Sequence, residues 1–249
     1  MIDVGLDALA LDSLTEIAGI TFISFNKNLH AVQLPSLRVA PLIVIQASPA
    51  LEAIALPMWV SANGLTLADL PALRMLDAGS LVQLPSLTLR RLSLPDLSGL
   101  TALTSVTTLS VDRVEELKNF RGLSSIQQVS SLALTGNPAL SSLDGLEAVS
   151  AISGHAAISG NPVLASVAGL HNVTSFGAGL EISSNAALPG IELTGMTTIV
   201  GDLAISSNPE VKSLSGLAAL TSVTGSLVVT GNAALPTAEI DALRLRLRK

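Results

Sequence analysis

The sequence of 249 residues contains no cysteine, few aromatic residues and few charged residues. The absence of cysteine excludes disulfides, thiol catalysis and zinc–thiolate sites. A core must be built from Leu, Val, Ile and Ala, because the aromatic residues are only Phe22, Phe25, Phe120, Phe176 and Trp59. Charged residues make up 13% and the net charge is −6. Nucleic acid is therefore not an expected partner, because neutralising phosphates requires clustered Lys and Arg.

Long apolar runs are also absent. No run of about 18 apolar residues is free of Pro, Gly or charge, so the sequence predicts no transmembrane span. The N-terminus lacks a basic segment, and Asp3, Asp7 and Asp12 interrupt its apolar residues. No signal peptide is visible in this segment.

What the chain does contain is a repeated six-residue phrase. It reads Thr-Gly-Asn-Pro-Ala-Leu at residues 135–140 and returns with small changes four more times. Its asparagines are separated by 24, 24, 23 and 24 residues, at Asn137, Asn161, Asn185, Asn208 and Asn232. A period of this length predicts a solenoid in which each repeat is one coil stacked on the last.

Each repeat also holds a pair of apolar residues that alternate with small or polar ones. Such period-two alternation predicts a short strand with both members of the pair pointing inward. The ten pairs, 22 to 24 residues apart, are Ile20/Phe22, Leu42/Val44, Leu65/Leu67, Leu87/Leu89, Leu109/Val111, Leu132/Leu134, Ala156/Ile158, Leu180/Ile182, Leu203/Ile205 and Leu227/Val229. In the first half the asparagine of the phrase is missing, and Leu-Pro marks the turns instead.

A second apolar string, with a step of three, follows each predicted strand. Residues 97–106 and 214–223 differ only at Thr101 versus Ala218. These runs are short and rich in Ser, Thr and Val, so they favour a tight arc of short strand and turn over an α-helix.

The two ends break the pattern. Residues 1–18 are interpreted as a partial N-terminal coil or cap, residues 19–236 as one repeat solenoid, and residues 237–249 as a C-terminal helical cap. Ile240, Leu243 and Leu247 have the spacing of an amphipathic helix face. The basic tail, Arg244 to Lys249, is expected to lie against the acidic body of the chain, with contact to anionic lipid as the alternative. Exposed ends also predict self-association as one outcome.

The repeated motif Leu-x-Ile-[Ser/Thr]-[Gly/Ser]-Asn-Pro-x-Leu-x-Ser-Leu-x-Gly-Leu-x-x-Leu-Thr-Ser-Val resembles receptor L-domain repeats, a divergent relative of the leucine-rich repeat. The similarity is strong over residues 97–247 and looser over residues 20–94. Residues 232–243 resemble the C-terminal cap of bacterial surface or secreted members, which often carry Cys where this chain has Ala238. The resemblance implies a recognition module without catalysis, located outside the cell or in its envelope.

The fold class that we expect is all-β: a right-handed parallel β solenoid of about ten coils with a short C-terminal capping helix. The expected function is non-enzymatic binding of a protein or glycan through the sheet face. A structural, self-assembling envelope protein is the alternative, and a β-helix enzyme acting on polysaccharide is less favoured.

Two columns of residues are the candidate sites. The asparagines of the phrase are predicted to form a buried structural ladder, since inward amides satisfy backbone groups at a coil corner. A hydroxyl row is predicted to face outward and to contribute to binding; its members are Thr135, Ser159, Ser183, Ser206 and Thr230. Solvation of an exposed sheet by these hydroxyls is the alternative.

Other candidates are weaker. Ile23, Ile43 and Ile45, with Trp59, form a candidate apolar partner patch, unless the N-terminal segment covers that coil. The charge cluster of residues 112–121 is interpreted as a solvated loop insertion with mutual salt bridges, rather than an acid–base site. The three histidines have no metal-like spacing, so no metal, cofactor or catalytic residue is predicted.

Overall fold

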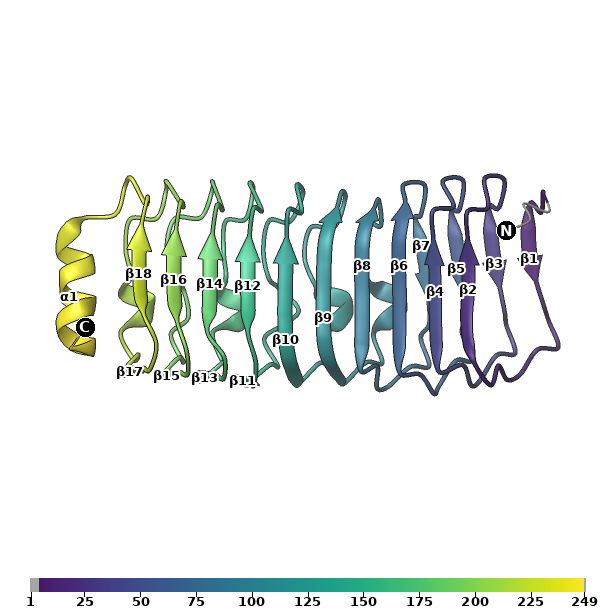
Figure 1. The fold of residues 1–249 in the computed structure, drawn as a ribbon, viewed down its shortest axis with the longest axis horizontal. Coiled ribbons are helices and arrows are strands. Elements are labelled where there is room, and N and C mark those ends of the chain that lie inside the picture. Colours follow the sequence, from purple (N-terminus) through teal and green to yellow (C-terminus); the bar gives the residue numbers. More distant parts are fainter. Residues whose placement is uncertain (1–4, 249) are drawn as a thin grey trace.

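The computed structural model describes residues 5–248. The chain winds into an elongated parallel β solenoid of about ten turns, with a helix at the C-terminal end (Figure 1). One side of the stack is a parallel sheet of ten long-face strands, as predicted. They are β2 (Ile20–Ser24), β4 (Leu42–Gln46), β6 (Gly64–Leu70), β8 (Ser86–Leu92), β9 (Ser105–Val114), β10 (Gln128–Thr135), β12 (Ala156–Ser159), β14 (Leu180–Ser183), β16 (Leu203–Ser206) and β18 (Leu227–Thr230).

Equivalent side chains lie above one another along this sheet. Leu132 pairs with Ala156, which pairs with Leu180. Leu180 pairs in turn with Leu203, and Leu203 with Leu227. One vertical line therefore runs through five successive coils, and the inward residues of every strand fill a single continuous apolar core.

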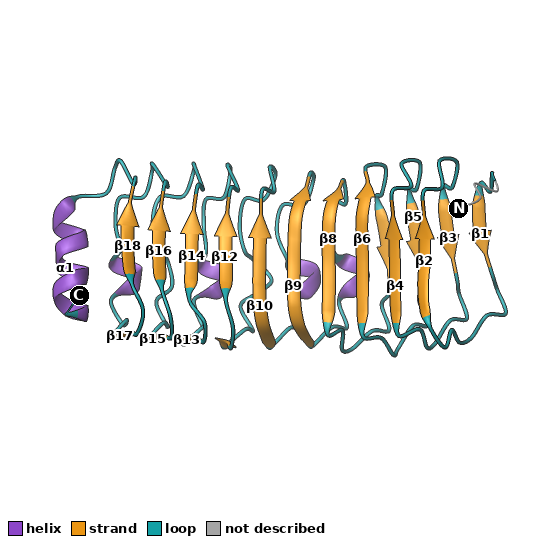
Figure 2. Ribbon diagram, viewed as in Figure 1, coloured by secondary structure: helices purple, strands orange, loops and turns teal. Residues whose placement is uncertain are grey.

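The back of the stack changes character along its length (Figure 2). In the N-terminal part it is a four-stranded parallel sheet of β1 (Ala8–Ala10), β3 (Ala31–Gln33), β5 (Ala53–Ala55) and β7 (Met75–Asp77). Further along, single 3₁₀ turns replace these strands: η1 (Ser98–Leu100), η2 (Arg121–Leu123), η3 (Ala168–Leu170) and η4 (Ser215–Leu217). Two-residue strands follow at β11 (Ala151–Ile152), β13 (Ser175–Phe176), β15 (Thr198–Ile199) and β17 (Ser222–Val223). The apolar step of three matches the three residues per turn of a 3₁₀ helix.

Glycine in the Leu-x-Gly-Leu phrase has a steric cause. A Cβ atom on Gly169 would lie 2.0 Å from the backbone oxygen of Leu143 in the preceding coil. On Gly216 it would lie 1.8 Å from the backbone oxygen of Ile191. The coils approach so closely at this corner that only a residue without a side chain fits.

The first two coils differ from the predicted register. Ile43 and Ile45 pair with the core residues Leu65 and Leu67, and Ile23 pairs with Ile45. The step between the second and third coils is therefore 22 residues (43 to 65), not 23 (42 to 65). Because side chains alternate across a sheet, this slip of one residue exchanges the inward and outward faces of both strands.

The predicted apolar patch is wrong for the same reason. Ile23, Ile43 and Ile45 are buried, and Trp59 is fully buried with its ring nitrogen donating to the Ala40 carbonyl at 3.2 Å. The outward residues of the first strand are instead Ile20 and Phe22, which are 58% and 64% exposed. Leu42 and Val44 are likewise on the outer side of β4, although they are half-buried.

The C-terminal helix α1 (Thr237–Leu247) covers the last coil. Leu243 and Leu247 are buried against the core, and Ile240 packs beside them. The Glu239 carboxylate accepts a hydrogen bond from the backbone N–H of Leu214 at 3.0 Å, and Arg246 donates to the Leu217 carbonyl at 2.7 Å. The helix therefore satisfies backbone groups of the last coil as well as covering its apolar residues.

At the other end, β1 pairs with β3, and Leu14 and Ile17 pack partly against the core. The division into residues 1–18, 19–236 and 237–249 stays a prediction, and residues 1–4 and 249 lie outside the described part of the chain. No helix of the described residues is long and apolar enough to cross a membrane.

Replacement of Gly169 by Ala should lower the free energy of unfolding by about 3 kcal/mol, because the new methyl group forces two coils apart. The matched control is Gly190→Ala, where the Cβ would lie 3.6 Å from the nearest atom, the Ser213 oxygen. That control should change stability by less than about 0.5 kcal/mol. Urea unfolding of both variants checks this, and equal stabilities would contradict the close coil contact.

Candidate functional site

The corner at the end of each face strand has a left-handed backbone. One residue per coil adopts it, with φ between 50° and 68°: Phe25, Ala47, Asp69, Arg91, Arg113, Gly136, Gly160, Ser184, Ser207 and Gly231. Seven of these ten residues are not glycine, although the left-handed region costs such residues about 1 kcal/mol or more. The same corner is therefore imposed on every coil, and the next residue of each coil points into the core.

In the C-terminal half that inward residue is the asparagine of the phrase. The Asn137 backbone N–H donates to the side-chain oxygen of Asn161 at 3.0 Å, and that of Asn161 donates to Asn185 at 3.1 Å. The same bond joins Asn185 to Asn208 and Asn208 to Asn232, at 3.0 Å each. Each of the five side-chain amides also donates to backbone carbonyls, as Asn161 does to Leu134 at 3.0 Å. Four of the five asparagines are fully buried, and Asn232 in the last coil is partly exposed.

The ladder column also continues into the first half, where the sequence pattern indicated no asparagine. Asn26 occupies the same position in the first coil, and its backbone N–H donates to the Ser48 hydroxyl at 3.3 Å. Between Ser48 and Asn137 the column is apolar, with Leu70, Leu92 and Val114. The signal was the constant 22-residue step from 26 to 48, 70, 92 and 114, which the wrong register of the first coils concealed.

The predicted hydroxyl row lies in register on the outer side of the sheet. Thr135 pairs with Ser159, and Ser159, Ser183, Ser206 and Thr230 follow in adjacent strands. The row is not uniformly open. Ser183 is only 8% exposed, because its hydroxyl donates to the Glu181 carboxylate at 2.6 Å. A ligand on this face would thus meet the row as two groups on either side of Glu181.

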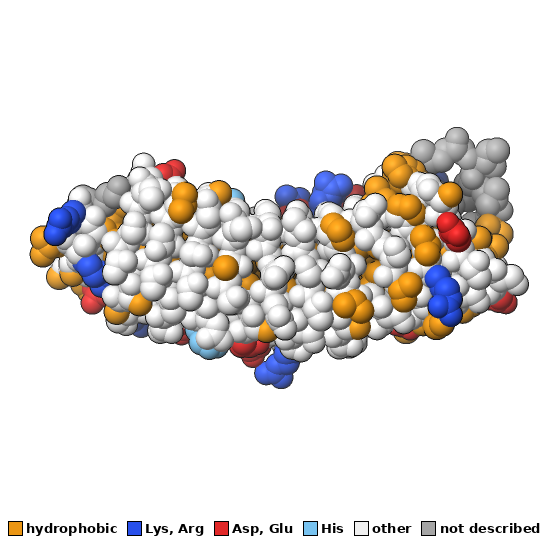
Figure 3. Space-filling model, turned by 90° about the horizontal axis from the view of Figure 1, so that it is seen from below, with side chains coloured by type: hydrophobic (Ala, Val, Ile, Leu, Met, Phe, Trp, Pro, Cys, Tyr) orange, Lys and Arg blue, Asp and Glu red, His pale blue; other side chains and the backbone are white. Residues whose placement is uncertain are grey.

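A neighbouring outward column shows how the face varies along the stack. It begins with Phe22 and Val44, becomes hydroxylic at Thr66, Thr88 and Ser110, and continues through Ala133, Ala157, Glu181, Ala204 and Val228. The face is therefore apolar at its N-terminal end and covered by small side chains elsewhere. Charged side chains are also sparse on the side of the molecule seen from below (Figure 3).

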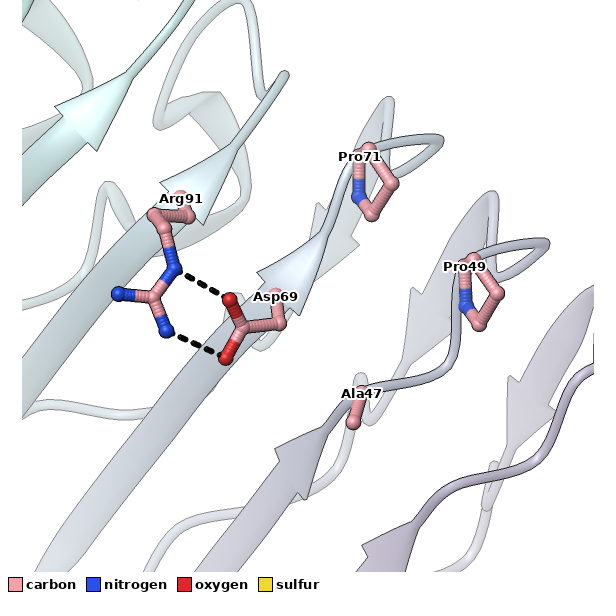
Figure 4. A pocket seen from close by; sticks show the side chains of 5 residues that line it. All are labelled: Ala47, Pro49, Asp69, Pro71 and Arg91. Atoms are coloured by element: carbon pink, nitrogen blue, oxygen red, sulfur yellow. Dashed lines mark hydrogen bonds and ion pairs between the residues drawn. The ribbon is translucent and has the colours of Figure 1, made fainter.

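An open hollow of about 420 Å³ lies at the corner of the second to fourth coils. Ala47, Pro49 and Pro71 form its apolar lining, and Asp69 and Arg91 form its polar wall (Figure 4). Asp69 and Arg91 are residues of the left-handed corner column, so their side chains project from adjacent coils toward each other. The sequence analysis missed this hollow, because it depends on which residues share a corner position.

The polar wall of the hollow is a two-point ion pair. The Arg91 Nε donates to Asp69 Oδ1, and Arg91 Nη2 donates to Asp69 Oδ2 at 2.7 Å. Arg90 lies 3.9 Å from the same carboxylate. The hydrogen bond from Arg91 lowers the pKa of the Asp69 carboxyl and raises the pKa of the Arg91 guanidinium. The carboxylate is therefore held ionised and oriented beside the apolar lining.

The charge cluster of residues 112–121 is not a loop insertion. Asp112 and Arg113 belong to β9, and their side chains approach to 3.6 Å. Arg121 pairs with Asp144 of the next coil at 3.1 Å. The tail arginines bond close by: Arg244 lies 3.9 Å from Asp241 in the same helix. These pairs are largely exposed, and such pairs contribute little to stability.

A smaller hollow of about 280 Å³ brings His155, Glu181 and Asp202 together on the sheet side. Asp202 accepts a hydrogen bond from the Ser226 backbone N–H at 2.6 Å, while Glu181 is engaged by Ser183. His171 lies in another part of the coil, after η3. Within residues 5–248 no group of His, Asp and Glu residues is arranged to hold a metal ion.

The sequence matches no profile of a known protein family, and no curated protein matches it. Among solved structures, an internalin from Listeria monocytogenes is similar over 90% of this chain and 86% of that chain, with 14% identity and a TM-score of 0.30. This similarity is too weak to indicate a shared function.

Replacement of Asn161 by Leu should lower the free energy of unfolding by about 3 kcal/mol, because buried donors of Asn137 lose their acceptor. Leucine fits the column elsewhere, at Leu70 and Leu92, so volume is not the cause. The control is Ser159→Ala on the outer face, with an expected change below about 0.5 kcal/mol. Thermal and urea unfolding measure both; a loss for Asn161→Leu no larger than the control's would contradict the ladder.

The Asp69–Arg91 pair predicts a pH dependence. Since the pKa of Asp69 is lowered by folding, the pair contributes stability above the ordinary pKa of Asp, and that contribution is lost as pH falls through the lowered pKa. Asp69→Asn keeps a residue that tolerates the left-handed corner, and this variant should lose less stability than the wild type between neutral and strongly acidic pH. Urea unfolding across this range measures the difference, and parallel curves would refute the prediction.

Proposed function

We propose that the protein is a non-enzymatic binding module that recognises a protein or glycan through the outer face of its ten-strand sheet. The observation that supports this proposal is the outward column from Phe22 to Val228. Its side chains are small over most of the stack and lie in register on adjacent strands. A ligand can therefore approach the sheet closely along several coils. Repeat proteins offer extended surfaces of this kind for binding.

The two halves of the face favour different contacts. Ile20 and Phe22 form an exposed apolar end, which fits a protein surface because aromatic and aliphatic side chains dominate interface cores. The hydroxyl row, from Thr135 to Thr230, offers hydrogen-bonding groups suited to a glycan. The hollow beside Asp69 and Arg91 adjoins the apolar half. Location at a cell surface or in an envelope belongs to the same proposal and rests on the resemblance to L-domain repeats.

The test uses a bulky charge placed on the face. Ala133 lies on β10 between Ser110 and Ala157, so Ala133→Arg projects a long side chain over small neighbours. Its control is Ala218→Arg, at the exposed end of η4 on the back of the stack. Wild type and control should retain the same ligand on a glycan array or among purified surface proteins, while Ala133→Arg should lose at least about tenfold in affinity, or about 1.4 kcal/mol.

The same measurement separates the two ligand classes. Phe22→Ser should weaken a protein ligand and leave a glycan bound to the hydroxyl row unchanged. Equal binding by wild type, Ala133→Arg and Ala218→Arg would place the contact elsewhere and refute the proposal.

A further inference from the structure

The N-terminal end of the stack has open strand edges and exposed apolar side chains. Among residues 5–248, β1 and β2 are the terminal strands of their sheets, so each has one edge without a neighbouring strand. Leu6, Leu11 and Ile20 are 47%, 44% and 58% exposed. The inward residues of this coil, Leu9, Leu14 and Ile17, are only partly buried. Edges of this kind favour association with another chain.

The opposite end shows how this protein covers an open coil. Helix α1 places Leu243 and Leu247 over the core of the last coil, and its Glu239 and Arg246 bond a backbone N–H and a backbone carbonyl there. One helix face thus supplies both apolar contact and partners for the unpaired backbone groups of a strand edge.

The outer face of the same helix carries residues of the same kinds. Ala238, Ala242 and Leu245 are spaced by four and three residues, so they form one stripe along the helix. All three are exposed, and Leu245 is 81% exposed. Arg248 follows at the end of the stripe. Basic and hydrophobic side chains are visible together at this end of the molecule (Figure 3).

The charges of the two ends are opposite. Residues 5–26 contain Asp7, Asp12 and Glu16 and no basic residue, whereas the end of the helix carries Arg244, Arg246 and Arg248. The second coil adds Lys27 and Arg38 near the acidic end. The attraction is therefore modest, and salt should screen it.

We propose that helix α1 of one copy covers the N-terminal end of a second copy, so that the protein associates head to tail. The two surfaces lie at opposite ends of an extended stack (Figure 1). Such a contact leaves a free surface at each end, and it extends into open chains rather than closing as a dimer. A single helix face is smaller than the ~800 Å² per partner of a standard interface, so we expect a dissociation constant in the micromolar range or weaker, on the order of 10⁻⁶ M or more.

The experiment blocks each end separately in the full chain. Asp12→Lys with Glu16→Lys reverses the charge of the N-terminal end, and Leu245→Glu with Arg248→Glu reverses the outer face of the helix. By sedimentation velocity, the wild type should increase in mass from about 10 µM to about 1 mM without a plateau at the dimer, and less so at about 0.5 M salt. Each double variant alone should be a monomer. An equimolar mixture of the two should form a 1:1 dimer and nothing larger, because one intact end of each kind remains.

Circular dichroism and the thermal midpoint establish that both double variants are folded, since all four positions are exposed. A wild type that stays monomeric over the whole range overturns the proposal. So does a helix variant that still associates alone, which would indicate contact between two N-terminal ends, or a mixture that remains monomeric. None of these outcomes bears on ligand binding by the sheet face.

Discussion

Hydrogen bonding between successive coils is the interaction on which the rest of the structure depends. Backbone N–H groups of one coil donate to carbonyls of the next, as Leu132 does to His155 at 3.0 Å and Ala156 to Gly179 at 3.1 Å. These bonds form in series only if every coil follows the same path, and the left-handed corner imposes that path ten times. The buried asparagines extend the bonding through the corner, where strand pairing ends and backbone groups would otherwise be left without partners.

This arrangement separates residues that hold the fold from residues free to bind. Inward positions and the ladder are fixed by packing and hydrogen bonding, whereas the outward columns contact solvent and can change without loss of the core. Phe22, Thr66, Ala133 and Glu181 occupy the same column, although they differ in size, polarity and charge. The left-handed corner has the same property: Asp69 and Arg91 form the wall of a hollow at positions where other coils carry glycine or serine.

The C-terminal half was predictable because its residues alternate without ambiguity. In Leu132-Ala-Leu and Leu203-Ala-Ile only one parity can fill a core, so the sheet, its ten strands and the final helix followed from the pattern. The first two strands, Ile-Thr-Phe-Ile-Ser and Leu-Ile-Val-Ile-Gln, are apolar at both parities, and hydropathy could not choose between them. That one-residue error hid Asn26 and Ser48 in the ladder and exchanged Phe22 with Ile23. The hollow at Asp69 and Arg91 could not be predicted at all, since it depends on the direction of two side chains at a corner.

Amide hydrogen exchange tests the central claim most directly. The backbone N–H groups of Asn137, Asn161, Asn185 and Asn208 each donate to the side-chain oxygen of the next asparagine. If this bonding holds the coils together, these amides exchange only through global unfolding, and their opening free energies equal the free energy of unfolding measured in urea. Opening free energies several kcal/mol below that value would show that the corner opens locally, and would contradict the account.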